Sequence, residues 1–132
     1  MNLDISSFEK ATLSLEIAMN EFKKNESEFV RDSCIQRFDY TYELAWKTIK
    51  RFLELTAPNP NEIDLLSFQE LIREANEKGL LLSDWDTWKL YRIYRGTTNH
   101  AYNADKTIEI HNEIPGFLKE VHYLIVQLKK RL

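Results

Sequence analysis

The highest concentration of groups that could bind or cut a nucleic acid lies in residues 88–106. Cations and aromatic rings alternate along this segment: Trp88, Lys89, Tyr91, Arg92, Tyr94, Arg95 and Tyr102. Arginine forks hold phosphate groups and aromatic planes stack on unpaired bases, so this composition is typical of single-stranded RNA contact. It also arises when the rings pack in a core and the arginines face solvent, and composition alone favours that simpler interpretation.

Arg95 and His100 are the two residues whose types and spacing suggest a reaction. On a continuous helix, five residues turn the chain by about 140°, so the two side chains would diverge. A helix break at Gly96 would let them converge on one phosphate. An imidazole can take the proton of a ribose 2′-hydroxyl at neutral pH, and a guanidinium can stabilise the charge that develops on the phosphate. Such a pair cleaves RNA without a metal, although an Arg-x4-His spacing is common by chance.

Other catalytic chemistries find no support in the sequence. The three histidines, His100, His111 and His122, are eleven residues apart. Each gap would span roughly 16 Å on a helix, which is too long for joint metal ligation. There is no glycine-rich phosphate loop and no GxSxG elbow, and Cys34 lies on an apolar stripe where a buried, inert thiol is expected. We therefore expect no metal site within one chain and no cofactor.

The elements that must position these residues are helices. The chain has 132 residues with only three glycines and three prolines, which favours one domain over residues 1–132 with few, long elements. Ser6 with Glu9 predicts a capped first helix, and a second helix is expected over residues 27–55, ended by the prolines that follow. These features predict an all-α fold, an up-and-down bundle of five or six helices that resembles a four-helix bundle.

The second half of the chain predicts further helices. Ser67 with Glu70 opens a short helix that Gly79 closes, and another begins near residue 83. A last helical region covers residues 104–132, with Pro115 as either a kink or a fresh start. The helix that begins near residue 83 is apolar around most of its circumference, so we expect it to be buried on more than one side.

The net charge and the N-terminal residues indicate where the protein is located and which partners are expected. The net charge is −3, which gives no general attraction to nucleic acid or to an anionic membrane. The N-terminal residues carry early acids and no unbroken apolar run, which argues against a signal peptide or a membrane span. The single cysteine suits a reducing compartment. We therefore expect a cytoplasmic protein with no membrane contact.

Two segments together resemble a known family. Residues 31–54, RDSCIQRFDYTYELAWKTIKRFLE, are similar to the second helix of the HEPN superfamily, in the branch paired with minimal nucleotidyltransferases in toxin–antitoxin operons. Arg95, His100 and Tyr102 match the R-x4-H-x-Y motif of that branch. The resemblance extends over essentially the whole chain. One departure is Gly96, where family members often carry asparagine.

The resemblance implies a homodimer in which two motif segments face each other across a cleft. It implies that Arg95 and His100 form the ribonuclease pair, and that Tyr102 is the tyrosine that a partner nucleotidyltransferase modifies with AMP. A simpler role for Tyr102 is a hydroxyl that orders the loop near His100. Weaker candidates for nucleotide or RNA contact complete the set: Trp88, Lys89, Arg92 and Asn99.

Three functions remain open at this point. The first is the toxin of a HEPN–MNT toxin–antitoxin module, a metal-independent endoribonuclease controlled by a cognate minimal nucleotidyltransferase. The second is a non-catalytic substrate-binding or regulatory subunit of a two-component nucleotidyltransferase. The third is a structural dimeric scaffold. The presence of His100 beside Arg95 favours the first, because a site that only binds has less need of a titratable base.

Overall fold

The structure is a computed structural model that describes residues 2–97 and 103–132. Six helices and no strand occur in these two ranges: α1 (Ser6–Lys24), α2 (Glu28–Thr56), α3 (Pro60–Asp64), α4 (Phe68–Glu77), α5 (Trp85–Thr97) and α6 (Ala104–Arg131). The expected all-α class is confirmed. None of these helices is long and apolar enough to cross a bilayer.

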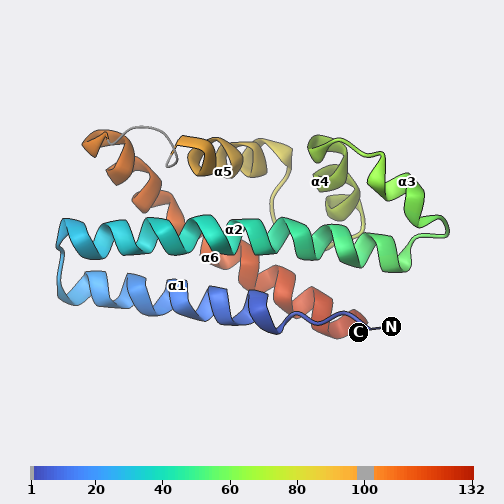
Figure 1. The fold of residues 1–132 in the computed structure, drawn as a ribbon, viewed down its shortest axis with the longest axis horizontal. Coiled ribbons are helices and arrows are strands. Elements are labelled where there is room, and N and C mark those ends of the chain that lie inside the picture. Colours follow the sequence, from blue (N-terminus) through green and yellow to red (C-terminus); the bar gives the residue numbers. More distant parts are fainter. Residues whose placement is uncertain (1, 98–102) are drawn as a thin grey trace.

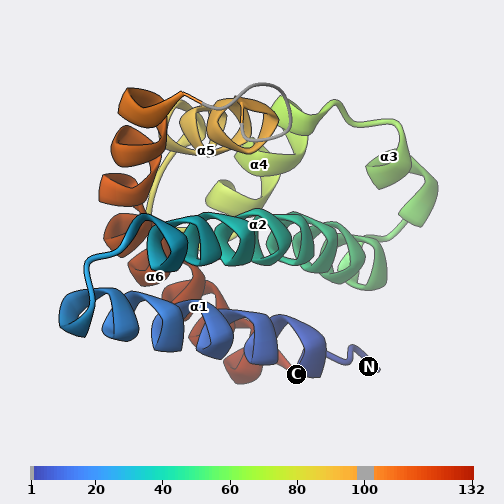
Figure 2. The same cartoon turned by 60° about the vertical axis from the view of Figure 1, so that its left-hand side comes forward.

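Helix α2 is the centre of the bundle and contacts every other helix. Helices α1 and α2 run side by side in opposite directions, α6 crosses them, and α3, α4 and α5 lie on the side of α2 away from α1 (Figure 1). Both views place the chain ends close together (Figure 2). There the ammonium of Lys129 lies 2.9 Å from the carboxylate of Glu9. The start of α1 and the end of α6 are therefore joined at one end of the bundle.

Local sequence signals explain most of the helix ends. The amide of Glu70 donates to Ser67 Oγ at 3.2 Å and the amide of Ser67 donates to Glu70 Oε1 at 3.0 Å, which confirms the capping box of α4. Gly79 follows α4 with a φ of +76°, a conformation in which other residues are strained, so it ends that helix as expected.

Three local expectations need correction or completion. The capping box predicted at Ser6 and Glu9 is wrong: Ser6 is already helical, and its amide donates instead to Asp4 Oδ1 at 2.9 Å. The short helix α3 was not expected; Pro60 stands at its first position, where the missing amide costs nothing, and Asn59 caps it. Pro115 lies inside the one continuous helix α6.

The core is built from aromatic rings that join α2, α5 and α6. Phe38 of α2 packs edge-on against Phe117 of α6 with ring centroids 4.8 Å apart, and Tyr91 of α5 packs against Phe117 at 5.1 Å. Trp88 lies 5.9 Å from Tyr91 and is fully buried. This cluster fixes the position of α5, the helix that carries the motif arginine.

A buried carboxylate fixes the entry to α5. Glu120 of α6 is only 1% exposed and accepts hydrogen bonds from the amides of Leu82 and Ser83 at 2.7 and 3.0 Å. It also accepts one from Trp88 Nε1 at 2.9 Å. Three donors satisfy the carboxylate, which is the condition for burying a charge in a core. Glu120 thereby ties the α4–α5 connection and the first turns of α5 to α6.

Helix α5 is buried on one side within this chain. Trp88, Tyr91 and Tyr94 face the core, whereas Leu90 and Ile93 are 36% and 49% exposed. The expectation that α5 is covered on more than one side is thus not met by the described residues of a single chain. The apolar side chains on its outer face require another partner if they are to be covered.

Candidate functional site

The motif arginine lies at the end of α5. The helix continues through Gly96 to Thr97, the last residue described before the gap at residues 98–102, so the break that the sequence predicted at Gly96 is not seen. His100, Tyr102 and Asn99 lie outside the described residues. The convergence of His100 with Arg95 therefore remains a prediction.

Arg95 is held by a carboxylate of the central helix. Its Nε lies 3.5 Å from Glu43 Oε1, with the Arg95 side chain 26% exposed. The other oxygen of Glu43 accepts a hydrogen bond from Trp46 Nε1 at 3.2 Å and lies 3.8 Å from Lys47 Nζ. The pair of Glu43 with Lys47 is an ordinary contact within one helix. The pair with Arg95 joins α2 to α5, and sequence spacing offered no signal for it.

Arg95 also lines a cavity of about 490 Å³ between α2, α4 and α5. This volume falls in the usual range for small-ligand sites. Its described lining includes the cations Lys50, Arg92 and Arg95 and one carboxylate, that of Glu43. The cavity is therefore locally cationic, although the whole chain carries a net charge of −3.

Aromatic rings form the other part of this cavity wall. Phe68 of α4 lies between the two rings from α2, with centroids 6.0 Å from Trp46 and 6.4 Å from Tyr42. The guanidinium of Arg92 lies 4.7 Å from the centroid of Phe68, close enough for a cation–π interaction. Cations and aromatic rings thus stand together here, but these rings come from α2 and α4, whereas the described rings of residues 88–106 that the sequence offered lie in the core.

Tyr42 carries a buried hydroxyl in this wall. The residue is 2% exposed, and its hydroxyl oxygen has no hydrogen-bond partner among the residues that the structure describes. Burial raises the pKa of Tyr42 well above its ordinary value, and the nearby charges of Arg92 and Arg95 oppose that rise. The hydroxyl therefore stays protonated at neutral pH, within the electrostatic influence of the same two arginines.

The structure separates the expected binding residues. Arg92 and Arg95 share the cavity, whereas Lys89 is exposed on α5 outside its lining. Trp88 is fully buried and its indole donates to Glu120, so it offers no face to a base. Its position supports the simpler interpretation of that ring, a core residue that positions α5.

The remaining titratable groups have structural surroundings. His111 is buried against Phe22, with ring centroids 4.3 Å apart, and His122 contacts Glu16. Cys34 is buried, and burial raises the pKa of its thiol, as expected for an inert residue. Within residues 2–97 and 103–132, no group of three or more metal-binding side chains comes together.

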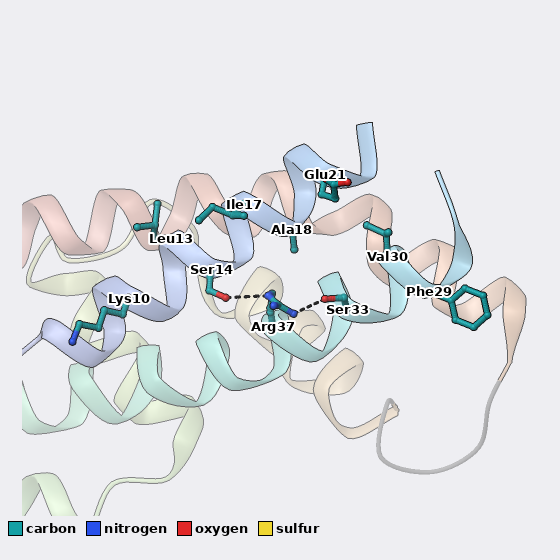
Figure 3. A pocket seen from close by; sticks show the side chains of 10 residues that line it. All are labelled: Lys10, Leu13, Ser14, Ile17, Ala18, Glu21, Phe29, Val30, Ser33 and Arg37. Carbon is teal, nitrogen blue, oxygen red and sulfur yellow. Dashed lines mark hydrogen bonds between the residues drawn. The ribbon is translucent and has the colours of Figure 1, made fainter. Parts of the chain in front are cut away.

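A larger cavity, of about 610 Å³, lies between α1 and α2 (Figure 3). Arg37 stands at its centre, where Nε donates to Ser14 Oγ at 2.9 Å and a second nitrogen donates to Ser33 Oγ. Leu13 and Ile17 form part of its apolar wall. This cavity lies on the α1 side of α2, whereas α5 lies on the opposite side (Figure 1). The cavity beside Arg95 is therefore the candidate site.

Comparison with known proteins decides the family. The model of the family described as nucleotidyltransferase substrate binding protein like matches residues 3–130. This chain belongs to that family. The resemblance seen in residues 31–54 and in the motif is thereby confirmed.

A named protein and a solved structure that are similar to this family member both come from Haemophilus influenzae. A protein named probable ribonuclease HepT is 37% identical over 97 residues, which cover 74% of this chain and 66% of that protein, just under two thirds of its length. A solved structure, described as revealing the fold of a substrate-binding domain of a nucleotidyltransferase, is similar with a TM-score of 0.88 and 29% identity. That similarity covers 96% of this chain and 99% of the other.

Proposed function

We propose that this protein is the toxin of a HEPN–MNT toxin–antitoxin module, a metal-independent endoribonuclease controlled by a cognate minimal nucleotidyltransferase. The observation that carries the proposal is the setting of Arg95. It lies at the end of a helix fixed by a buried aromatic cluster, is held by Glu43 at 3.5 Å, and lines a cationic, aromatic cavity. Similarity to a protein named probable ribonuclease supports the same activity.

The reaction assigns one task to each motif residue. The imidazole of His100 accepts the proton of a ribose 2′-hydroxyl, and the freed oxygen attacks the adjacent phosphorus. Arg95 stabilises the extra negative charge on the phosphate oxygens. The bond from phosphorus to the 5′-oxygen then breaks, and that oxygen takes up a proton from water. The products are a 2′,3′-cyclic phosphate and a 5′-hydroxyl, and the reaction needs no metal ion.

Assembly and regulation complete the proposal. A homodimer would cover the exposed Leu90 and Ile93 of α5 and bring two motif segments together. Transfer of AMP to Tyr102 by the nucleotidyltransferase would place a bulky anion near the site and exclude RNA. The protein acts in the cytoplasm, where its RNA substrate is found.

The second candidate is a non-catalytic substrate-binding or regulatory subunit of a two-component nucleotidyltransferase. The description of the similar solved structure as a substrate-binding domain favours it. In this function Arg95 and His100 would hold a ligand without cutting it.

The deciding experiment is to express the chain alone, beside Arg95→Ala and His100→Ala variants, and to measure growth arrest and RNA integrity. Arg51→Ala, which removes an exposed cation of α2 outside the cavity, is the matched control. The ribonuclease function predicts RNA cleavage by the wild type and the control but not by the two motif variants, with EDTA having no effect. If all four chains leave RNA intact and cells growing, the ribonuclease function is wrong, and the chain is better treated as the subunit of a nucleotidyltransferase.

A further inference from the structure

The cavity beside Arg95 contains an unused hydrogen-bonding group. Tyr42 is one of the residues that line the cavity, and its hydroxyl is buried and has no partner in the described part of the chain. Leaving such a group unpaired away from water costs free energy, so a hydroxyl in this position indicates a ligand that pairs with it. A hydroxyl can donate and accept, as the edge of a nucleobase requires.

The walls around Tyr42 suit a flat, aromatic ligand. Trp46 and Phe68 line the same cavity, are only partly buried, and pack edge-on to each other with centroids 6.0 Å apart. A base that stacks on an aromatic face gains affinity whatever its identity, because every base has a π face. A polar group beside the stack then adds discrimination between base edges.

Two of the three cations that line the cavity form ion pairs, and the third forms none with the described residues. Lys50 Nζ lies 2.9 Å from Asp64, and Arg95 is paired with Glu43. Arg92 is exposed and lies over Phe68, and no ion pair to it occurs among the described residues. A guanidinium that rests on an aromatic ring keeps its donors for a phosphate.

We infer that this cavity is a nucleotide subsite, in which the base of an RNA residue next to the scissile phosphate stacks on Trp46 and meets Phe68 edge-on, with its polar edge on the Tyr42 hydroxyl. Arg92 holds the phosphate of that same nucleotide. The inference rests on the proposed function and adds to it a hydroxyl that selects which base lies beside the cut and a cation that holds the phosphate of that nucleotide.

The test measures binding separately from cleavage. Tyr42→Phe and Arg92→Gln are compared with matched controls: Tyr91→Phe removes the hydroxyl of another buried tyrosine, and Arg51→Gln removes another exposed arginine, both outside the cavity lining. All four are made in a His100→Ala chain, and fluorescence anisotropy gives the Kd for a labelled single-stranded oligoribonucleotide and for a 5′-mononucleotide. Cleavage-site preference is then sequenced for each variant with His100 intact.

We expect each cavity variant to raise the Kd for the oligoribonucleotide by about fivefold to tenfold, and each control to stay within about twofold. Tyr42→Phe should also broaden the base preference beside the cut. Its melting temperature should not fall, because the hydroxyl has no internal partner. A marked fall would overturn the inference, since it would reveal such a partner.

The remaining outcomes separate this inference from the proposed function. If the wild type cuts RNA but both cavity variants keep its Kd and its base preference, the subsite is wrong and the ribonuclease stands. If no chain cuts RNA while Tyr42→Phe and Arg92→Gln still weaken oligoribonucleotide binding, the cavity is a nucleotide-binding site without a cut beside it, and the ribonuclease is wrong. If only the mononucleotide binds in a manner that depends on Tyr42 and Arg92, the assignment to an RNA strand is overturned.

Discussion

Glu43 of α2 holds Arg95 of α5 through an ion pair in which Nε lies 3.5 Å from Oε1. Glu43 is in turn oriented by the indole of Trp46, which donates to its other oxygen at 3.2 Å. Arg95 therefore approaches any substrate phosphate from a position set by the central helix. An ion pair that orients a catalytic group acts on the rate more than on substrate binding.

This pair predicts the effect of Glu43→Gln on RNA cleavage. The amide keeps the size of the side chain and an acceptor for Trp46 but loses the charge that orients Arg95. We expect kcat to fall about fivefold to tenfold, or roughly 1–1.4 kcal/mol in the barrier, with KM nearly unchanged. Lys47→Gln removes the other cation beside Glu43 and should leave kcat at the wild-type value. An unchanged kcat in Glu43→Gln would exclude the positioning role.

Glu120 predicts a large loss of stability on truncation. Glu120→Ala leaves three donors without an acceptor, namely Trp88 Nε1 and the amides of Leu82 and Ser83. We expect the free energy of unfolding to fall by about 3–5 kcal/mol in urea titration. Glu113→Ala removes an exposed acid from the same helix and should change it by less than about 0.5 kcal/mol. Similar values for the two variants would contradict this account of the core.

The two glycines at helix ends should respond oppositely to alanine. Gly96 lies inside α5, and a Cβ added there meets no atom of the described residues within 4 Å, so Gly96→Ala should stabilise the fold by about 0.5–1 kcal/mol. Gly79 has a φ of +76°, and its added Cβ would lie 3.3 Å from the Arg131 guanidinium, so Gly79→Ala should destabilise it by about 1–2 kcal/mol. Thermal unfolding measures the change in stability of each variant. If both substitutions stabilise the fold, or both destabilise it, this account of the two glycines is wrong.

His111 predicts a loss of stability on mild acidification. Burial, and secondarily the charge of Arg31, lower the pKa of His111 below its ordinary value. Below pH about 6.5 the imidazole of His111 binds a proton in the unfolded chain but stays neutral in the folded chain. The free energy of unfolding therefore decreases as the pH is lowered from about 6.5 to the pKa of His111 in the folded chain. The loss is at most about 1.4 kcal/mol at pH 5.5, one unit below the unfolded value.

Urea titrations at pH 7.5 and pH 5.5 measure this dependence. His111→Gln removes the titrating group, so its free energy of unfolding should change less between the two pH values than that of the wild type. His122→Gln is the control, because that histidine is exposed beside Glu16. Equal pH dependence in the wild type and in His111→Gln would show that other groups cause the loss.

Short-range patterns in the sequence determined the helical class and most of the helix ends. The spacing of apolar residues, the Ser67–Glu70 cap and the turn at Gly79 act within a few residues, so they can be seen without the fold. The cap at Ser6 failed because a competing acceptor, Asp4, lies two residues earlier. The motif and the second-helix segment also carried enough information for the family.

Tertiary structure alone decided which side chains meet around the motif arginine. Arg95 pairs with Glu43, and Trp88 donates a hydrogen bond to Glu120, between helices that are far apart in the sequence. The packing of α4 and α5 on α2 creates the cavity and places Tyr42, with its unpaired hydroxyl, in the cavity wall. Helical periodicity predicts that a residue is buried, but it carries no information on the polar partner that residue will meet. That partner depends on how the helices pack, which only the complete fold determines.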